Sequence, residues 1–96
     1  MYWFQCNYDN FAGLLNIDSL TKVTVDEDNK TFTLHFDLAN VTLSFDISNL
    51  STSKATLDIA FCFIHQLKAK IVSQMNLGLP FLLDNSSVQT LLSNCI

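Results

Sequence analysis

The side chains that could carry nucleophilic chemistry lie on two predicted strands. His35 and Ser44 would face the same side of a sheet, with Asp37 and Asp46 nearby, as a base, a nucleophile and orienting carboxylates. Such a group needs an oriented base and donors that stabilise the oxyanion. Here it would lie on a flat, open face without a Gly-rich oxyanion loop. We therefore expect a solvated surface, no catalytic residues, and a protein that is not an enzyme.

Two further patterns could suggest a metal site. Cys62 and His65 are three residues apart and could share one face of a helix, but the remaining cysteines and the other histidine are scattered. Asp26 and Asp28 resemble the start of a calcium-binding loop, which would also require a glycine and a terminal glutamate. With two glycines in the chain, Gly-rich phosphate loops are excluded. We expect no metal and no cofactor.

The charge pattern excludes some classes of partner. The net charge is −4, and the five basic residues are all lysines. Arginine supplies the forked donor that binds phosphates and guanine edges, so its absence argues against nucleic-acid binding. The acidic residues are spread too thinly for a DNA mimic. The longest apolar run, residues 59–64, is far too short to span a membrane.

The cysteines and the first residues bear on the cellular compartment. Cys6, Cys62 and Cys95 are odd in number and form no CxxC motif. The first nine residues have neither a basic segment nor a long apolar one, so we expect no signal peptide. Together these features predict free thiols in a reducing, cytoplasmic environment. Four N-x-S/T triplets are expected to be chance matches in a chain rich in Asn, Ser and Thr.

Alternating apolar and polar residues predict three strands, at 22–26, 31–38 and 41–47. Residues 2–8 have the composition of a further strand, and 10–15 could be a helical turn or a loop. Pairing Val25 with Phe32 leaves a four-residue turn, and pairing Leu38 with Val41 leaves a two-residue turn. The second turn lacks the favoured Asn-Gly, so a longer loop stays open. The predicted buried face comprises Val23, Val25, Phe32, Leu34, Phe36, Leu38, Val41, Leu43, Phe45 and Ile47.

A long helix is predicted over residues 53–76, capped by Ser51 or Ser53 and ended by the segment that contains Gly78 and Pro80. In the tail, Asp84 or Ser86 could cap a short helix that folds back over the long one. Residues 1–96 are thus expected to form one α+β domain. An antiparallel meander of three to four strands would pack on one long helix, followed by a short C-terminal helix.

One set of residues in the predicted strands and turns forms a pattern: Asn16-Ile17-Asp18-Ser19-Leu20, Val23, Val25-Asp26-Glu27-Asp28-Asn29-Lys30-Thr31, Leu34, Phe36 and Thr42-Leu43-Ser44-Phe45-Asp46. In this pattern the chain resembles a loose group of small uncharacterised proteins from AT-rich bacteria and their phages. The resemblance covers residues 16–75 and implies a strand meander before one helix, in a bacterial or phage protein. Members often carry Asn-Gly where this chain has Ala39-Asn40. It implies no activity and no site residues.

The apolar content points to a partner surface. Hydrophobic residues make up 49% of the chain and charged residues 15%, against a usual charged share of about 25%. Phe61 and Val72 fall on the polar side of the predicted helix, and Tyr2, Trp3 and Phe4 concentrate aromatic area at the N-terminus. We expect a non-catalytic interaction module that forms a homodimer through the helix or through an N-terminal edge strand. In this reading, Phe61→Asp disrupts self-association more than folding.

Three alternatives stay open. The N-terminal aromatic residues could instead complete the core. The small, acidic chain could be a phage or mobile-element inhibitor that docks on a host enzyme. An apolar cavity between the helix and the sheet could hold a small apolar ligand.

Overall fold

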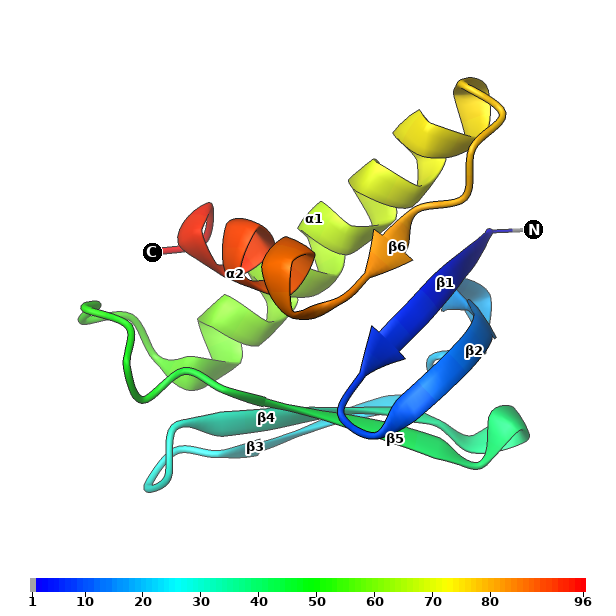
Figure 1. Cartoon of the computed structure of the whole chain (residues 1–96). Helices are drawn as coiled ribbons and strands as arrows, with labels where there is room; N and C mark the ends of the chain where they lie inside the picture. Colours follow the sequence, from blue (N-terminus) through cyan, green and yellow to red (C-terminus); the bar gives the residue numbers. More distant parts are fainter. Residues whose placement is uncertain (1) are drawn as a thin grey trace.

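Two three-stranded sheets and two α-helices make up the computed structural model, which describes residues 2–96 (Figure 1). The α+β class and the order of meander, long helix and short helix are as predicted. In chain order the elements are β1 (Trp3–Tyr8), β2 (Phe11–Asn16), the 3-10 turn η1 (Ile17–Ser19), β3 (Lys22–Asp26), β4 (Thr31–Phe36), the 3-10 turn η2 (Asp37–Ala39), β5 (Val41–Asp46), α1 (Thr56–Asn76), β6 (Leu82–Leu83) and α2 (Asn85–Ser93).

The larger sheet is the antiparallel meander β3-β4-β5. The predicted pairing of Val25 with Phe32 is confirmed, and Lys22 lies opposite His35 as expected. The second predicted pairing is wrong, because Val41 lies opposite Phe36. His35 therefore faces Thr42 rather than Ser44.

The turn between β4 and β5 explains this shift. A two-residue turn would have needed positive φ at Ala39, which is unfavourable for alanine. Instead residues 37–39 form η2, and Asn40 alone takes the left-handed conformation, with φ 54°. Leu38, predicted to be buried, is 88% exposed in this longer connection. Because the register moved by two residues, the buried face of the strands is otherwise kept.

The smaller sheet has the order β2-β1-β6. Asp9 and Asn10 form a two-residue turn with φ 54° and 63°, the geometry that joins two antiparallel strands most tightly. The expectation of a helical turn or loop over 10–15 is therefore wrong, since this segment is β2. β6 pairs in parallel with the middle of β1. β1 thus lies between two strands, so the N-terminal aromatic residues do not form an edge strand.

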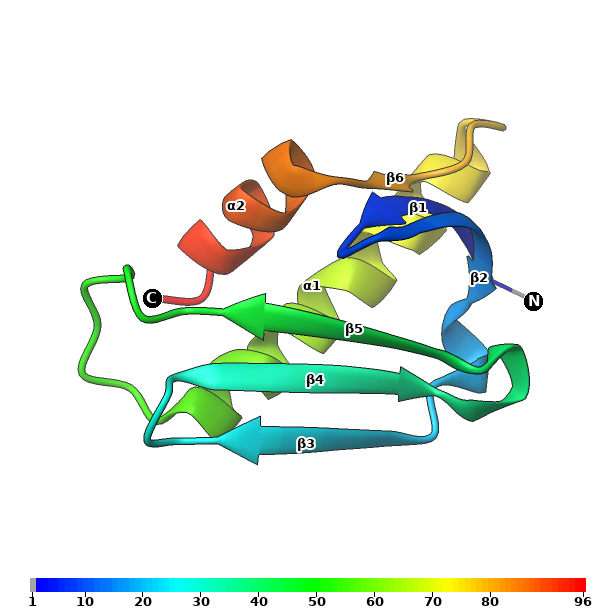
Figure 2. The same cartoon turned by 60° about the horizontal axis from the view of Figure 1, so that its bottom comes forward.

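Helix α1 covers one face of the larger sheet (Figure 2). Three fully buried aromatic rings fill the layer between them. The centroid of Phe45 lies 4.9 Å from that of Phe32 and 4.7 Å from that of Phe63 on α1. The smaller sheet joins the same core through Phe4, whose ring centroid is 6.3 Å from that of Phe36. No helix within residues 2–96 is long and apolar enough to cross a membrane.

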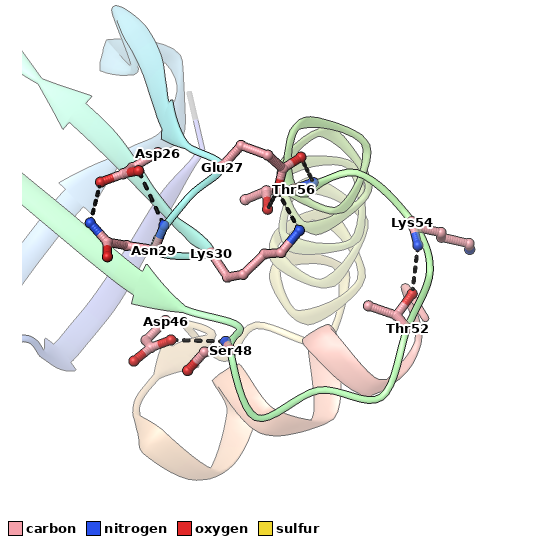
Figure 3. A network of polar contacts seen from close by, with 9 residues as sticks. All are labelled: Asp26, Glu27, Asn29, Lys30, Asp46, Ser48, Thr52, Lys54 and Thr56. Atoms are coloured by element: carbon pink, nitrogen blue, oxygen red, sulfur yellow. Dashed lines mark hydrogen bonds and ion pairs between the residues drawn. The ribbon is translucent and has the colours of Figure 1, made fainter.

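The first backbone amide of α1 finds its hydrogen-bond partner in a distant turn (Figure 3). The predicted serine caps are wrong, because the helix begins at Thr56 after Ala55, which makes no side-chain capping bond. Glu27, in the turn between β3 and β4, accepts hydrogen bonds from the amide of Thr56, at 3.0 Å, and from its hydroxyl. Lys30 Nζ donates to the same carboxylate at 2.8 Å. A charged side chain thus fixes the helix onto the sheet.

The C-terminal segment returns along α1, as predicted (Figures 1 and 2). Asp84 caps α2 by accepting from the Ser87 amide, while Ser87 Oγ accepts from the Asp84 amide. A disulfide joins Cys62 to Cys95, so the expectation of free thiols is wrong for these two residues. The helical return brings together two cysteines that lie 33 positions apart in the sequence. The argument from thiols for a reducing compartment therefore loses its support.

Candidate interaction surface

The suggested group of His35 and Ser44 does not form. His35 Nε2 lies 2.9 Å from Thr24 Oγ1, and Ser44 Oγ lies 3.0 Å from Thr33 Oγ1. The Ser44 amide donates to Asp9 at the turn of the smaller sheet, at 2.8 Å. These pairs are the cross-strand hydrogen bonds of an exposed sheet face.

The suggested pair of Cys62 and His65 is broken as well, because the Cys62 sulfur is bonded to Cys95. Within residues 2–96, no three metal-ligating side chains come together. Cys6 is the cysteine that stays unpaired in the described chain, and it is buried. Burial raises the pKa of its thiol to about 11, so the reactive thiolate is scarce at neutral pH.

The five residues predicted for an interface divide between the core and the surface. Phe4 is fully buried, which removes it from any surface and shows that this aromatic residue completes the core. Alternation along β1 is the reason, because Phe4 and Cys6 point inward while Trp3 points outward. Tyr2, Trp3, Phe61 and Val72 are exposed, with Trp3 at 46% and Phe61 at 57%.

Phe61 and Val72 lie on one side of α1, separated by three helical turns. Eleven residues at 100° each bring them within about 20° around the helix axis, but about 16 Å apart along it. His65 and Lys68 are exposed in the interval. We call Leu57, Phe61 and Val72 the helix stripe. It is apolar but interrupted by charged and polar groups.

Trp3 belongs to a more continuous apolar area. It lines a recess of about 300 Å³ with Met75, Leu79 and Pro80 at the end of α1. It also lines a second recess, of about 190 Å³, with Leu14 and Leu38. Among residues 2–96, no charged side chain lines either recess. We call Trp3, Leu14, Leu38, Met75 and Leu79 the Trp3 surface; each of them is exposed.

Sequence reasoning found Trp3 but not the other members of the Trp3 surface. Leu14 could have been found, since it precedes Leu15 in an extended segment and must face the opposite side. Leu38 was assigned to a strand and to the core. Met75 lies in the last turn of α1 and is 43% exposed, which the residue type alone does not predict.

Comparison of the chain with protein-family models, with curated proteins and with solved structures found no match in any of the three. The resemblance over residues 16–75 therefore stays a prediction.

Proposed function

We propose that this chain is a small non-catalytic protein–protein interaction module that pairs with a second copy of itself through the Trp3 surface. The observation that carries this proposal is the meeting of four separate segments at one end of the molecule. The start of β1, the end of β2, the end of α1 and the turn between β4 and β5 lie on the same side in both views (Figures 1 and 2). Exposed apolar patches of this kind mark association sites.

The charge of the chain favours a second copy of it as the partner that covers the Trp3 surface. Each chain carries a net charge of −4, so two copies repel each other wherever their acidic surfaces meet. The described residues that line both recesses beside Trp3 include no charged one, so two copies can meet there without burying like charges of these residues. Trp3 provides a large rigid side chain of the type that dominates binding energy at interfaces.

The helix stripe is the weaker candidate for the same role. Phe61 is the more exposed aromatic residue, but Lys68 and His65 lie between it and Val72. A partner that covered the whole stripe would have to desolvate the Lys68 ammonium, which is unfavourable without an acidic partner.

The other two readings receive less support. The rings of Phe32, Phe45 and Phe63 contact one another between α1 and the larger sheet, so a small apolar ligand there would have to displace packed side chains. An inhibitor of a host enzyme would need a recognition surface as well, and the Trp3 surface would be its most suitable part. For that role, however, no charged residue among residues 2–96 lines the recesses beside Trp3 to indicate what the partner would be.

Molecular mass in solution tests the proposal. Light scattering at tens of micromolar should give twice the chain mass of 10.8 kDa. Trp3→Ser should give the monomer mass while the chain keeps its folded far-UV circular dichroism spectrum, because Trp3 is not one of the buried core residues. Phe61→Asp is the matched control on the helix stripe and should stay dimeric.

Two outcomes contradict the proposal in different ways. A monomeric wild-type chain at these concentrations removes self-association altogether. If Phe61→Asp dissociates the dimer and Trp3→Ser leaves it intact, the chain does self-associate, but through the helix stripe.

A further inference from the structure

The C-terminal arm, residues 82–96 with β6 and α2, is attached to the rest of the protein by few backbone interactions. β6 contributes two residue pairs with β1. Lys54 Nζ donates to the Cys95 carbonyl at 3.1 Å, near the end of the chain. The capping bonds between Asp84 and Ser87 are internal to the arm and do not hold it in place.

The arm nevertheless covers part of the core. Leu83, Val88, Leu91 and Leu92 are at most 1% exposed, and α2 packs beside α1. A helix of nine residues is marginal in water by itself, so α2 depends on this packing. Within residues 2–96, the one covalent cross-link of the arm is the bond between Cys62, in the first half of α1, and Cys95, just after α2.

We propose that the Cys62–Cys95 disulfide is a redox latch, whose reduction lets the C-terminal arm leave α1 while the larger sheet stays folded. This inference is independent of the proposed self-association. The latch depends on a difference in exposure between the two cysteines, because Cys95 is buried and Cys62 is partly exposed. A small thiol therefore reaches the bond from the side of Cys62.

The exchange is balanced with a thiol such as glutathione as the reductant. Its thiolate bonds to Cys62 Sγ, the bond between the two cysteines breaks, and Cys95 leaves as a thiolate that takes a proton from water. A second glutathione thiolate then attacks the mixed disulfide. Cys62 is released as a thiol, and two electrons end on the chain while glutathione disulfide leaves.

The loop geometry sets the size of the effect. The disulfide closes a loop across 33 residues of sequence. When the cross-link that closes a loop of that length is lost, the equilibrium constant for opening of the arm rises by roughly several hundredfold. The strands β3, β4 and β5 lie outside the arm and keep the hydrogen bonds of their own ladder.

Amide hydrogen exchange on the whole chain tests the latch. With the disulfide intact and then reduced, the amides of residues 88–95 should exchange roughly several hundredfold faster after reduction, while those of 32–36 in β4 change far less. Cys95→Ser should reproduce the reduced pattern without reductant. Cys6→Ser is the matched control and should keep the oxidised pattern.

Three results would overturn the latch. Exchange in α2 could be the same in both states, which would make the bond inert. Exchange in β4 could accelerate as much as in α2, which would make the bond a staple of the whole fold. Millimolar glutathione could also fail to release Cys62 and Cys95 for alkylation, which would make the bond resistant to cellular thiols. If Cys95→Ser does not fold, the reduced wild-type chain gives the same comparison.

Discussion

The outer faces of the two sheets of this small protein carry different kinds of side chains. On the larger sheet, hydroxyl groups and an imidazole pair across the strands, as in Thr24 with His35 and Thr33 with Ser44. On the smaller sheet, Trp3 and Leu14 face outward without charged neighbours in the recesses they line. Water satisfies the first face, whereas the second still exposes apolar area that a partner could cover.

The contacts that join the two sheets involve their inner faces and leave their outer faces separate. Tyr8 stacks on Phe45 with centroids 5.0 Å apart, and Asp9 accepts from the Ser44 amide. Through these contacts the smaller sheet buries its inner face against the edge of the larger one. The inner faces therefore form one core, while the outer faces remain independent and can be altered separately.

The largest expected effect separates that shared core from the surface. Phe63→Ala should lower the free energy of unfolding by about 3–5 kcal/mol, because it removes a fully buried ring that contacts Phe32 and Phe45. Phe61→Ala, two positions away on the same helix, should change it by less than about 0.5 kcal/mol. Urea unfolding followed by far-UV circular dichroism measures both. Equal losses for the two variants would contradict the burial pattern of α1.

The next effect concerns the turn that builds the smaller sheet. Asn10→Ala should destabilise the protein by about 1–2 kcal/mol, because alanine is strained at the φ of 63° that this turn needs. Asn10→Gly has the same loss of side chain without that strain, and should stay within a few tenths of a kcal/mol of the wild type. Thermal unfolding of the three chains measures the difference. If alanine and glycine behave alike, the left-handed turn does not determine how β1 and β2 pair.

The difference between the two sheets also explains which parts of the fold could be predicted from the sequence. β3, β4 and β5 alternate apolar and polar residues, and α1 shows a helical period, so local pattern suffices for both. β2 reads Phe-Ala-Gly-Leu-Leu-Asn, which has apolar residues on both faces and no alternation. β6 has two residues and joins a strand from the other end of the chain, and no local pattern predicts such a pairing.

The candidate surface was only partly predictable for a related reason. Trp3, Phe61 and Val72 stand out by residue type, but Leu38, Met75 and Leu79 belong to the surface only because three loops and ends meet. The disulfide likewise joins positions that share no short motif. At the start of α1, nearby serines were the obvious caps, whereas the true partner lies 29 residues earlier.

That distant cap gives the smallest expected effect, and it depends on pH. Hydrogen bonds from Lys30 and then from Thr56 lower the pKa of Glu27 from 4.5 to about 2. Because the folded pKa is the lower one, the Glu27 carboxylate stabilises the fold fully above pH 4.5, and this contribution is lost as the pH falls toward 2. Glu27→Gln should therefore be less stable than the wild type at pH 7.

At low pH this difference should shrink, since the wild-type side chain becomes neutral as well. Asp26, Asp46 and Asp84 also have lowered pKa values, so both chains lose stability in acid and only the difference between them reports on Glu27. Glu27 is exposed and its ion pair with Lys30 lies at the surface. The difference in stability between the wild type and Glu27→Gln is therefore small and should decrease further in high salt. Urea midpoints at pH 7, 4 and 2.5 measure it. A gap that stays constant over this range would show that the Glu27 charge does not hold α1 on the sheet.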